Sequence, residues 1–227
     1  MSNSIEVTDV MQRAGMLRGT VKVGWEDAAL GGGSIENKDV CGIGYLGVGK
    51  YKAKIKGKHT KEYAIWKAMF SRCYSKGTQT RQPTYVGCIV CKEWHNFQVF
   101  AEWYTNHNYF GLGYHLDKDI VVRGNKIYSP ETCTLVPLEI NSLLTNSKAA
   151  RGEHPQGVSY HKRDKKFIAQ VNTGVGSQTY LGSFGTAEEA FQAYKTAKEK
   201  YIKVVANKWR GAIEDSVYEN LLIYEIQ

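Results

Sequence analysis

Apolar side chains recur at helical spacing in several stretches of this 227-residue chain. Helices are expected to begin at Thr60, Asn96, Pro137 and Thr186, where Thr-Ala-Glu-Glu has the form of a capping box. A short last helix is expected over 215–223. The expected apolar faces of the first, second and fourth helices are Ile65, Trp66, Met69 and Cys73; Phe97, Phe100, Ala101 and Tyr104; and Ala190, Tyr194, Ala197 and Tyr201.

Other stretches alternate with a period of two residues, which is typical of strands. Residues 36–60 have this pattern between glycine turns. A tight turn at Arg123–Asn125 separates two further strands, and Gly174 and Gly176 turn a hairpin between the last two. The later expected strands cover 115–122, 133–136, 157–161, 166–172 and 178–183.

These elements predict an α+β fold. A ββα core is followed by a three-stranded antiparallel sheet packed on one helix. We expect an N-terminal arm or small subdomain at 1–35, a first domain at 36–146 and a polar linker at 147–156. A second domain follows at 157–210, and 211–227 holds the C-terminal helix. The arm includes a short helix over Ile5–Leu17.

Charge and composition indicate the class of partner. Thirty Lys and Arg face 22 Asp and Glu, which gives a net charge of +8 and favours a polyanion. The longest apolar runs are too short for a transmembrane helix, so no membrane partner is expected. The N-terminus lacks the pattern of a signal peptide, and we expect a cytoplasmic protein.

The five cysteines favour a reducing compartment over a disulfide framework, because their number is odd. Cys88 and Cys91 form a CxxC motif, which can hold one tetrahedral metal. Cys73 and Cys133 could complete a structural zinc site from other elements. The alternative is that these cysteines are small buried hydrophobic residues.

Polar side chains in 115–141 could carry phosphodiester chemistry. Hydrolysis needs a base that takes a proton from water and a divalent cation that neutralises the phosphate. The strand–turn–strand–helix order places a histidine, carboxylates and amides along this segment. In order they are His115, Asp117, Asp119, Asn125 and Asn141.

The run HLDKDIVVRGNKIYSPETCTLVPLEIN resembles the HNH (ββα-metal) endonuclease segment found in many phage and bacterial mobile-element proteins. YAIWKAMFSRCY and PTYVGCIVCKEWHNFQVFAEW resemble what precedes it in such proteins, so the resemblance covers Tyr63 to Asn146. It implies a ββα-metal core and a catalytic Mg²⁺ or Mn²⁺. We expect His115 to be the general base and Asp117 a metal ligand, with Asn141 supporting or ligating the metal and Asp119 in reserve.

This sequence departs from that family at the first strand. The family has Asp-His or Asn-His there, and this chain has Leu116-Asp117-Lys118-Asp119. His115 shares a strand face with Asp117 and could substitute, or it could be structural. The two aspartates could instead pair with Lys118 and Lys126. Asn125 could be a left-handed turn residue after Gly124.

Basic, aromatic and amide residues alternate in the predicted three-stranded sheet. Residues 151–210 hold 11 Lys and Arg against 5 Asp and Glu, a surplus of +6. Arg and Gln on a sheet can read base edges in the major groove. The candidate DNA-binding residues are Tyr160, His161, Arg163, Lys165, Lys166, Gln170, Asn172, Gln178 and Tyr180.

HPQGVSYHKRDKKFIAQV and QTYLGSFGTAEEAFQAYKTAKEKYIK resemble the Apetala-type (ethylene-response-factor) DNA-binding domain, which reads the major groove with its sheet. Positions that usually hold Arg or Trp there are Ser159, Phe167 and Asn172. The base specificity of the family therefore does not transfer. Core packing is the expected role of Phe167, Leu181 and Phe184.

The leading hypothesis is a metal-dependent DNA endonuclease of a phage or mobile element, with a C-terminal module that binds double-stranded DNA. The alternative is a non-catalytic DNA-binding protein on a degenerate HNH scaffold. A third class is a structural or interaction protein. The sequence does not define the target site or the oligomeric state.

Overall fold

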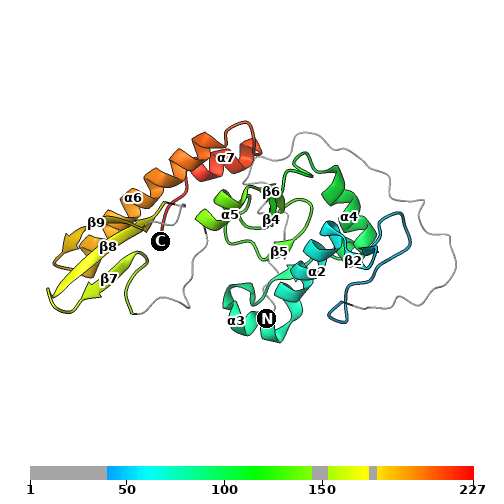
Figure 1. Ribbon diagram of the computed structural model, residues 1–227, viewed down its shortest axis with the longest axis horizontal. Coiled ribbons are helices and arrows are strands. Elements are labelled where there is room, and N and C mark those ends of the chain that lie inside the picture. The colour runs from blue at the N-terminus through cyan, green and yellow to red at the C-terminus, as the bar shows by residue number, and fades with distance from the viewer. Residues whose placement is uncertain (1–39, 145–152, 174–177) are drawn as a thin grey trace, which may run out of the picture. The chain divides into compact units, whose positions relative to one another are not determined.

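The computed structural model describes residues 40–144, 153–173 and 178–227. The expected arm at 1–35, its helix and the turn with Gly174 and Gly176 lie outside these residues, as does most of the expected linker. Glu36–Gln227 form one compact unit by their contacts. Helix and strand occur together throughout it, which confirms the α+β class. Figure 1 shows the order of the elements.

The first helices begin at the two expected caps. Thr60 accepts a hydrogen bond from the Tyr63 amide at the start of α2 (Lys61–Tyr74), and Asn96 does the same for the Gln98 amide at the start of α4 (Phe97–Asn106). Between them the chain is irregular and contains short elements. These are α3 (Lys76–Arg81), η1 (Pro83–Tyr85), β3 (Ile89–Val90) and η2 (Glu93–His95).

Aromatic side chains from α2, η2 and α4 build the first core. Trp66, Phe70, Trp94, Phe97 and Phe100 are fully buried there. The expected strands before α2 reduce to a small hairpin of β1 (Lys54–Ile55) and β2 (Lys58–His59). The aromatic residues of both helices are therefore core residues and do not form a stacking surface.

A compact unit of two strands and one helix follows. Strand β4 (His115–Asp117) pairs antiparallel with β6 (Thr134–Val136), and α5 (Leu138–Leu143) comes directly after β6. We call this the β4–β6–α5 unit. Between its strands, β5 (Ile127–Tyr128) leaves the pair and runs parallel to β3, which ties the unit to the first core.

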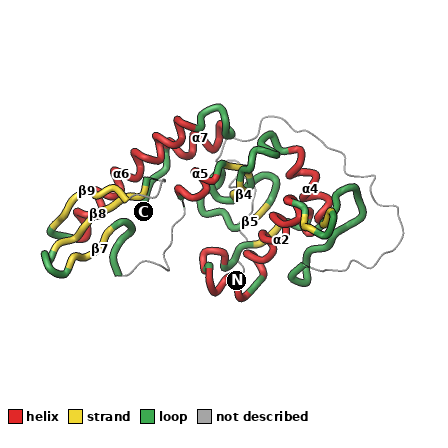
Figure 2. Tube along the Cα trace, viewed as in Figure 1, coloured by secondary structure: helices red, strands yellow, loops and turns green. Residues whose placement is uncertain are grey.

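The C-terminal sheet agrees closely with the expected one. Strands β7 (Val158–His161), β8 (Lys166–Asn172) and β9 (Gln178–Phe184) are antiparallel in this order, with a bulge opposite the Ala169–Gln170 step. Helix α6 (Ala187–Lys208) covers one face of the sheet, as Figure 2 shows. Its capping box is complete: Thr186 accepts from the Glu189 amide, and the Glu189 carboxylate accepts from the Thr186 amide.

The second half of α6 packs on the β4–β6–α5 unit. Ile202 and Val205 of α6 share one apolar core with Val136 and Ile140, and Leu221 of α7 (Asp215–Leu222) completes it. The sheet and the β4–β6–α5 unit therefore share a core, although the expected linker separates them in sequence.

Polar contacts reinforce this junction. The Glu139 carboxylate of α5 accepts from Lys208 Nζ at 2.6 Å and from Trp209 Nε1 at 2.8 Å. The Asn220 amide of α7 donates to the carbonyls of Ile120 and Val121. The segments before and after the expected linker are therefore joined by hydrogen bonds as well as by apolar packing.

The buried face of α6 departs from the expected stripe after Tyr194, where Lys198 and Ile202 are buried in place of Ala197 and Tyr201. Ala190 and Tyr194 are buried as expected, and the side chain of Lys198 is only 8% exposed. The structure records no hydrogen bond or ion pair for its ammonium among the described residues, and its recorded contact is the Tyr201 ring at 5.9 Å. Burial lowers the pKa of Lys198.

We expect Lys198→Met to stabilise the protein by about 1 kcal/mol, because it replaces a largely buried lysine with no recorded ion pair by an apolar side chain of similar length. For a chain of this size that corresponds to roughly 2–4 °C in Tm. The measurement is thermal unfolding at neutral pH. Lys200→Met on the exposed side of α6 is the control and should leave Tm nearly unchanged.

The stability gained by Lys198→Met should depend on pH. Since the pKa of Lys198 is lowered on folding, the unfolded chain binds more protons between the lowered and the ordinary lysine pKa. The native protein therefore gains stability as pH rises through that window, and the advantage of Lys198→Met should shrink. An advantage that grows with pH would contradict this account.

Candidate functional site

A groove of about 650 Å³ lies along the β4–β6–α5 unit. Its walls are one face of α2, the strand β4 with the residues after it, the turn before β5, and one residue of α5. Five of its lining residues are the candidates for phosphodiester chemistry. They are His115, Asp117, Asp119, Asn125 and Asn141.

Strand β4 places the first two candidates as the spacing predicts. Leu116 is buried against the core, while His115 is exposed and Asp117 is half-buried on the other side of the strand. Asn141 comes from α5, which packs against β4. The structure therefore brings His115, Asp117 and Asn141 to the same groove.

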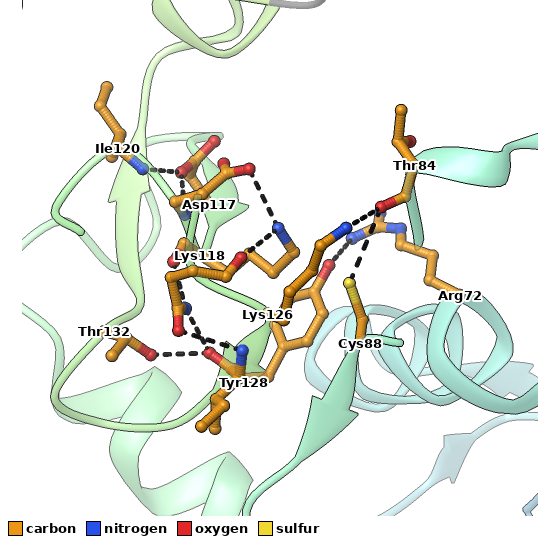
Figure 3. Close-up of polar contacts among 12 residues, drawn as sticks. Arg72, Thr84, Cys88, Asp117, Lys118, Ile120, Lys126, Tyr128 and Thr132 are labelled. Carbon is orange, nitrogen blue, oxygen red and sulfur yellow. Dashed lines mark hydrogen bonds and ion pairs between the residues drawn. The ribbon is translucent and has the colours of Figure 1, made fainter. Parts of the chain in front are cut away.

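Asp117 has a structural role as well. Its Oδ1 accepts hydrogen bonds from the backbone amides of Asp119 at 2.9 Å and Ile120 at 2.8 Å, which fixes the turn after β4 (Figure 3). Burial and the neighbouring charge of Asp119 raise the pKa of Asp117, and these two amides partly oppose the shift. The positive charge of Lys118 also lowers the pKa of Asp117.

Lys118 occupies the interior of this turn. It is only 6% exposed, and its ammonium donates to the Asp119 carboxylate and to the Asn125 carbonyl, both at 3.0 Å. Burial alone would lower the pKa of Lys118, but the Asp119 carboxylate outweighs it and the pKa is raised. This confirms the expected pairing of Asp119 with Lys118. It also places a fixed positive charge beside the candidate carboxylates.

Asn125 holds the turn together. Its Nδ2 donates to the carbonyls of Lys118 and Ile127, both at 2.6 Å, and its Oδ1 accepts from the Ile127 amide at 3.1 Å. The side-chain amide is thus fully used within the loop. Gly124 takes the left-handed conformation and Asn125 does not, so the alternative that made Asn125 the left-handed residue is wrong. Asn125 is a structural residue and supplies no group to the groove chemistry.

Three further cationic side chains line the groove, and the sequence pattern had assigned none of them to a binding site. Lys61 and Arg72 come from α2, and Lys126 comes from the turn before β5. The Lys126 ammonium donates to the Thr84 carbonyl and does not pair with Asp117 or Asp119, contrary to one of the alternatives above. The Arg72 guanidinium lies 3.5 Å from the Tyr128 hydroxyl and 5.6 Å from the centre of the Tyr85 ring.

The helical spacing of a second face of α2 could have placed Lys61 and Arg72 in the groove. Residues 61, 64, 65, 68 and 72 recur at helical spacing on the side opposite Trp66 and Phe70. With Lys118 and Lys126, the groove has four cationic side chains against two carboxylates. Such a surplus favours an anionic ligand.

The structure does not assemble the expected zinc site from Cys73, Cys88, Cys91 and Cys133. No group of three or more His, Cys, Asp or Glu in the described ranges is placed to hold a metal ion. Strand β3 consists of the two residues between Cys88 and Cys91. A shared zinc therefore stays a prediction that this geometry does not support.

Buried thiols are what the structure contains instead. Cys73, Cys88 and Cys133 are each at most 6% exposed. Burial raises the pKa of Cys73 and of Cys91 to about 12, and it raises the pKa of Cys133 as well. Cys73, Cys91 and Cys133 are therefore protonated at neutral pH. The buried thiols pack as small hydrophobic residues.

The C-terminal sheet presents a second polar surface. Residues Ala169 and Val171 of β8 are buried against α6, so the residues between them point to the opposite, open face. Cross-strand partners share that face. From the register, the open face consists of His161 and Lys166; Ser159, Ile168 and Ser183; Gln170 and Tyr180; and Asn172 and Gln178.

Six of the nine candidate DNA-binding residues lie on this open face. Tyr160 does not, because it pairs with Phe167 in the register and its ring contacts the Phe167 ring with centroids 5.0 Å apart. Arg163 and Lys165 belong to the turn between β7 and β8, where Arg163 pairs with Asp164. The open face and this turn together form a polar surface with a cationic end.

Comparisons with known proteins bear on this second surface. Residues 153–203 match the family model described as the AP2 domain, which contains β7–β9 and most of α6. A search of curated proteins found no match, and neither did a search of solved structures. No helix among the described residues is long and apolar enough to cross a membrane. The chain therefore carries an AP2 DNA-binding domain at 153–203, and double-stranded DNA is its partner.

Proposed function

We propose that this protein is a DNA endonuclease of the kind found in phages and mobile elements. In this proposal the AP2 domain binds the duplex, and the groove of the β4–β6–α5 unit hydrolyses a phosphodiester bond. The observation that carries it is the convergence of His115, Asp117 and Asn141 on one groove. The HNH resemblance of 115–141 supports the same assignment.

The charge of the groove suits a nucleic-acid backbone. Lys61, Arg72 and Lys126 line it, and no carboxylate pairs with any of these three side chains among the described residues. Cationic side chains attract phosphates over a distance set by the ionic strength. They would hold a strand across the groove next to His115.

The oxygen atoms in the groove fit a hard divalent cation. Mg²⁺ is usually held by one or two carboxylates together with waters and substrate phosphates. Asp117 and Asp119 supply the carboxylates, and the Asn141 amide supplies a further oxygen. A bound cation would neutralise the scissile phosphate and stabilise the leaving oxygen.

His115 is the proposed general base. Its imidazole is exposed to the groove, where it can take a proton from the attacking water. Asp117 lies on the same face of β4, which places the metal-ligating carboxylate beside the base. Lys118 follows Asp117, at the position where the HNH family has its histidine. Because its ammonium is buried and donates to the Asp119 carboxylate, Lys118 cannot serve as the base.

The shared core gives the two activities a structural connection. Glu139 and Trp209 join α5 to the end of α6, and the sheet is packed on the beginning of the same helix. DNA held by the sheet would therefore be presented to a groove on the same compact unit.

A second candidate function is a DNA-binding protein without nuclease activity. The observation that favours it is Lys118, whose ammonium sits on the Asp119 carboxylate where a metal ion would need that oxygen. In this alternative the groove binds the backbone through its cations and does not cut.

One prediction tests which face of the AP2 sheet contacts DNA. Gln170→Ala on the open face should weaken duplex binding by about 1–3 kcal/mol, because a base-reading amide is lost. Tyr160→Ala should leave binding nearly unchanged and lower Tm, since its ring packs on Phe167. Fluorescence anisotropy with the full chain measures the first effect and thermal unfolding the second. The reverse pattern would show that the helix side of the sheet contacts DNA.

The second prediction concerns catalysis. His115→Ala should reduce Mg²⁺- or Mn²⁺-dependent nicking of plasmid DNA by about 10²- to 10⁴-fold, because a general base is removed. Duplex affinity should stay within about twofold, since binding resides mainly in the AP2 domain. His59→Ala, on the small hairpin away from the groove, is the matched control.

The outcomes separate the two candidate functions. Nicking by the parent protein that survives His115→Ala would assign the base to another residue. A parent protein that binds duplex DNA but does not nick it with either metal ion would favour the non-catalytic alternative. A joint loss of binding and folding would give His115 a structural role.

A further inference from the structure

The open face of the AP2 sheet has an unusual set of side chains for a surface that reads bases. It consists of four cross-strand rows, and the first row, His161 with Lys166, lies next to the turn between β7 and β8. This end, with Lys162 and Lys165 in the turn, holds the positive charge. The other three rows carry no charged side chain.

The second row of the face carries an apolar side chain, Ile168. Ile168 lies between Ser159 on β7 and Ser183 on β9, and both serines are exposed. Serine side chains are short, so the Ile168 side chain stands above its neighbours on the open face. A thymine presents its C5-methyl group in the major groove, and apolar side chains contact it there.

The far end of the face carries amides. Gln170 pairs with Tyr180, and Asn172 pairs with Gln178. Asn and Gln bind adenine through its N6 and N7 atoms, whereas guanine is most often read by Arg or Lys. No arginine lies on the four rows, since Arg163 belongs to the turn and pairs with Asp164, and Lys166 is confined to the first row, away from the amides.

The spacing of these rows matches a few base pairs. From Ile168 to Asn172 the strand rises by roughly 13 Å, at about 3.3 Å per residue. Base pairs follow one another at about 3.4 Å, so this part of the sheet spans roughly four of them.

We propose that the open face of β7–β9 selects A·T base pairs in the major groove, with Ile168 against a thymine methyl group and Gln170 and Gln178 on adenine edges. This inference rests on the binding of DNA through the AP2 domain and does not depend on nuclease activity. The charged row and the turn supply phosphate contacts without base preference.

Selection of bound sequences from random duplexes tests the preference directly. The full chain should enrich a core of about four base pairs rich in A·T. A core rich in G·C, or binding without any sequence preference, would overturn the proposal and leave DNA binding intact. Failure to bind any duplex would instead contradict the assignment of DNA as the partner.

Replacing thymine by uracil in the selected site tests the contact of Ile168. Uracil lacks the methyl group, so affinity of the unmodified protein should fall by about fourfold per contacted position. With Ile168→Ala, the thymine and uracil duplexes should bind equally. Val204→Ala, an exposed apolar residue on α6, is the control and should keep the difference.

The amide contacts need a separate variant. Gln170→Ala should reduce the preference for A·T over G·C at one position of the site by about 5- to 150-fold, and Gln170→Arg should move that position toward guanine. Equal affinity for thymine and uracil duplexes in the unmodified protein, or an unaltered preference in both Gln170 variants, would refute the assigned contacts.

Discussion

The structure depends on one helix that packs on two parts of the fold within a single apolar core. The first half of α6 buries Ala169 and Val171 of the sheet, and its second half meets Val136 and Ile140 of the β4–β6–α5 unit. A three-stranded sheet has too little apolar surface to be stable without a partner on one face. Because the same helix covers both, the sheet and the groove unit are held by common packing, and Glu139 adds hydrogen bonds at the point where they meet.

The turn after β4 shows how the same side chains can serve structure and chemistry. Asp117 uses one carboxylate oxygen on two backbone amides, Asn125 uses its whole amide within the loop, and Lys118 neutralises Asp119. These bonds give the turn a fixed shape and place Asp117 beside His115. They also reduce the number of oxygen atoms left for a metal ion. In the proposed nuclease, a metal ion would have to compete with the Lys118 ammonium for the Asp119 carboxylate.

The AP2 sheet separates its two tasks by the alternation of its strands. Side chains that point to α6 provide packing, and those that point away are available to DNA. Tyr160 illustrates the rule, since its aromatic ring suggested base contact but its register places it with Phe167. The open face combines one apolar residue and several amides with a cationic end, an arrangement that suits contacts with base edges along one part and phosphates at the other.

The sequence by itself determined the elements that depend on local signals. The caps Thr60, Asn96 and Thr186 and the period-two strands β7–β9 are encoded within a few residues, and each appears where it was expected. The convergence of His115 and Asp117 also followed from strand periodicity. Only the tertiary structure decided the rest. Lys61 and Arg72 join the groove because α2, which packs on β3, forms one wall of it. Cys73, Cys88 and Cys133 are buried in the first core, and Lys198 is buried because α6 packs on both the sheet and the β4–β6–α5 unit. These outcomes depend on contacts between segments far apart in the chain, and local spacing carries no information about such contacts.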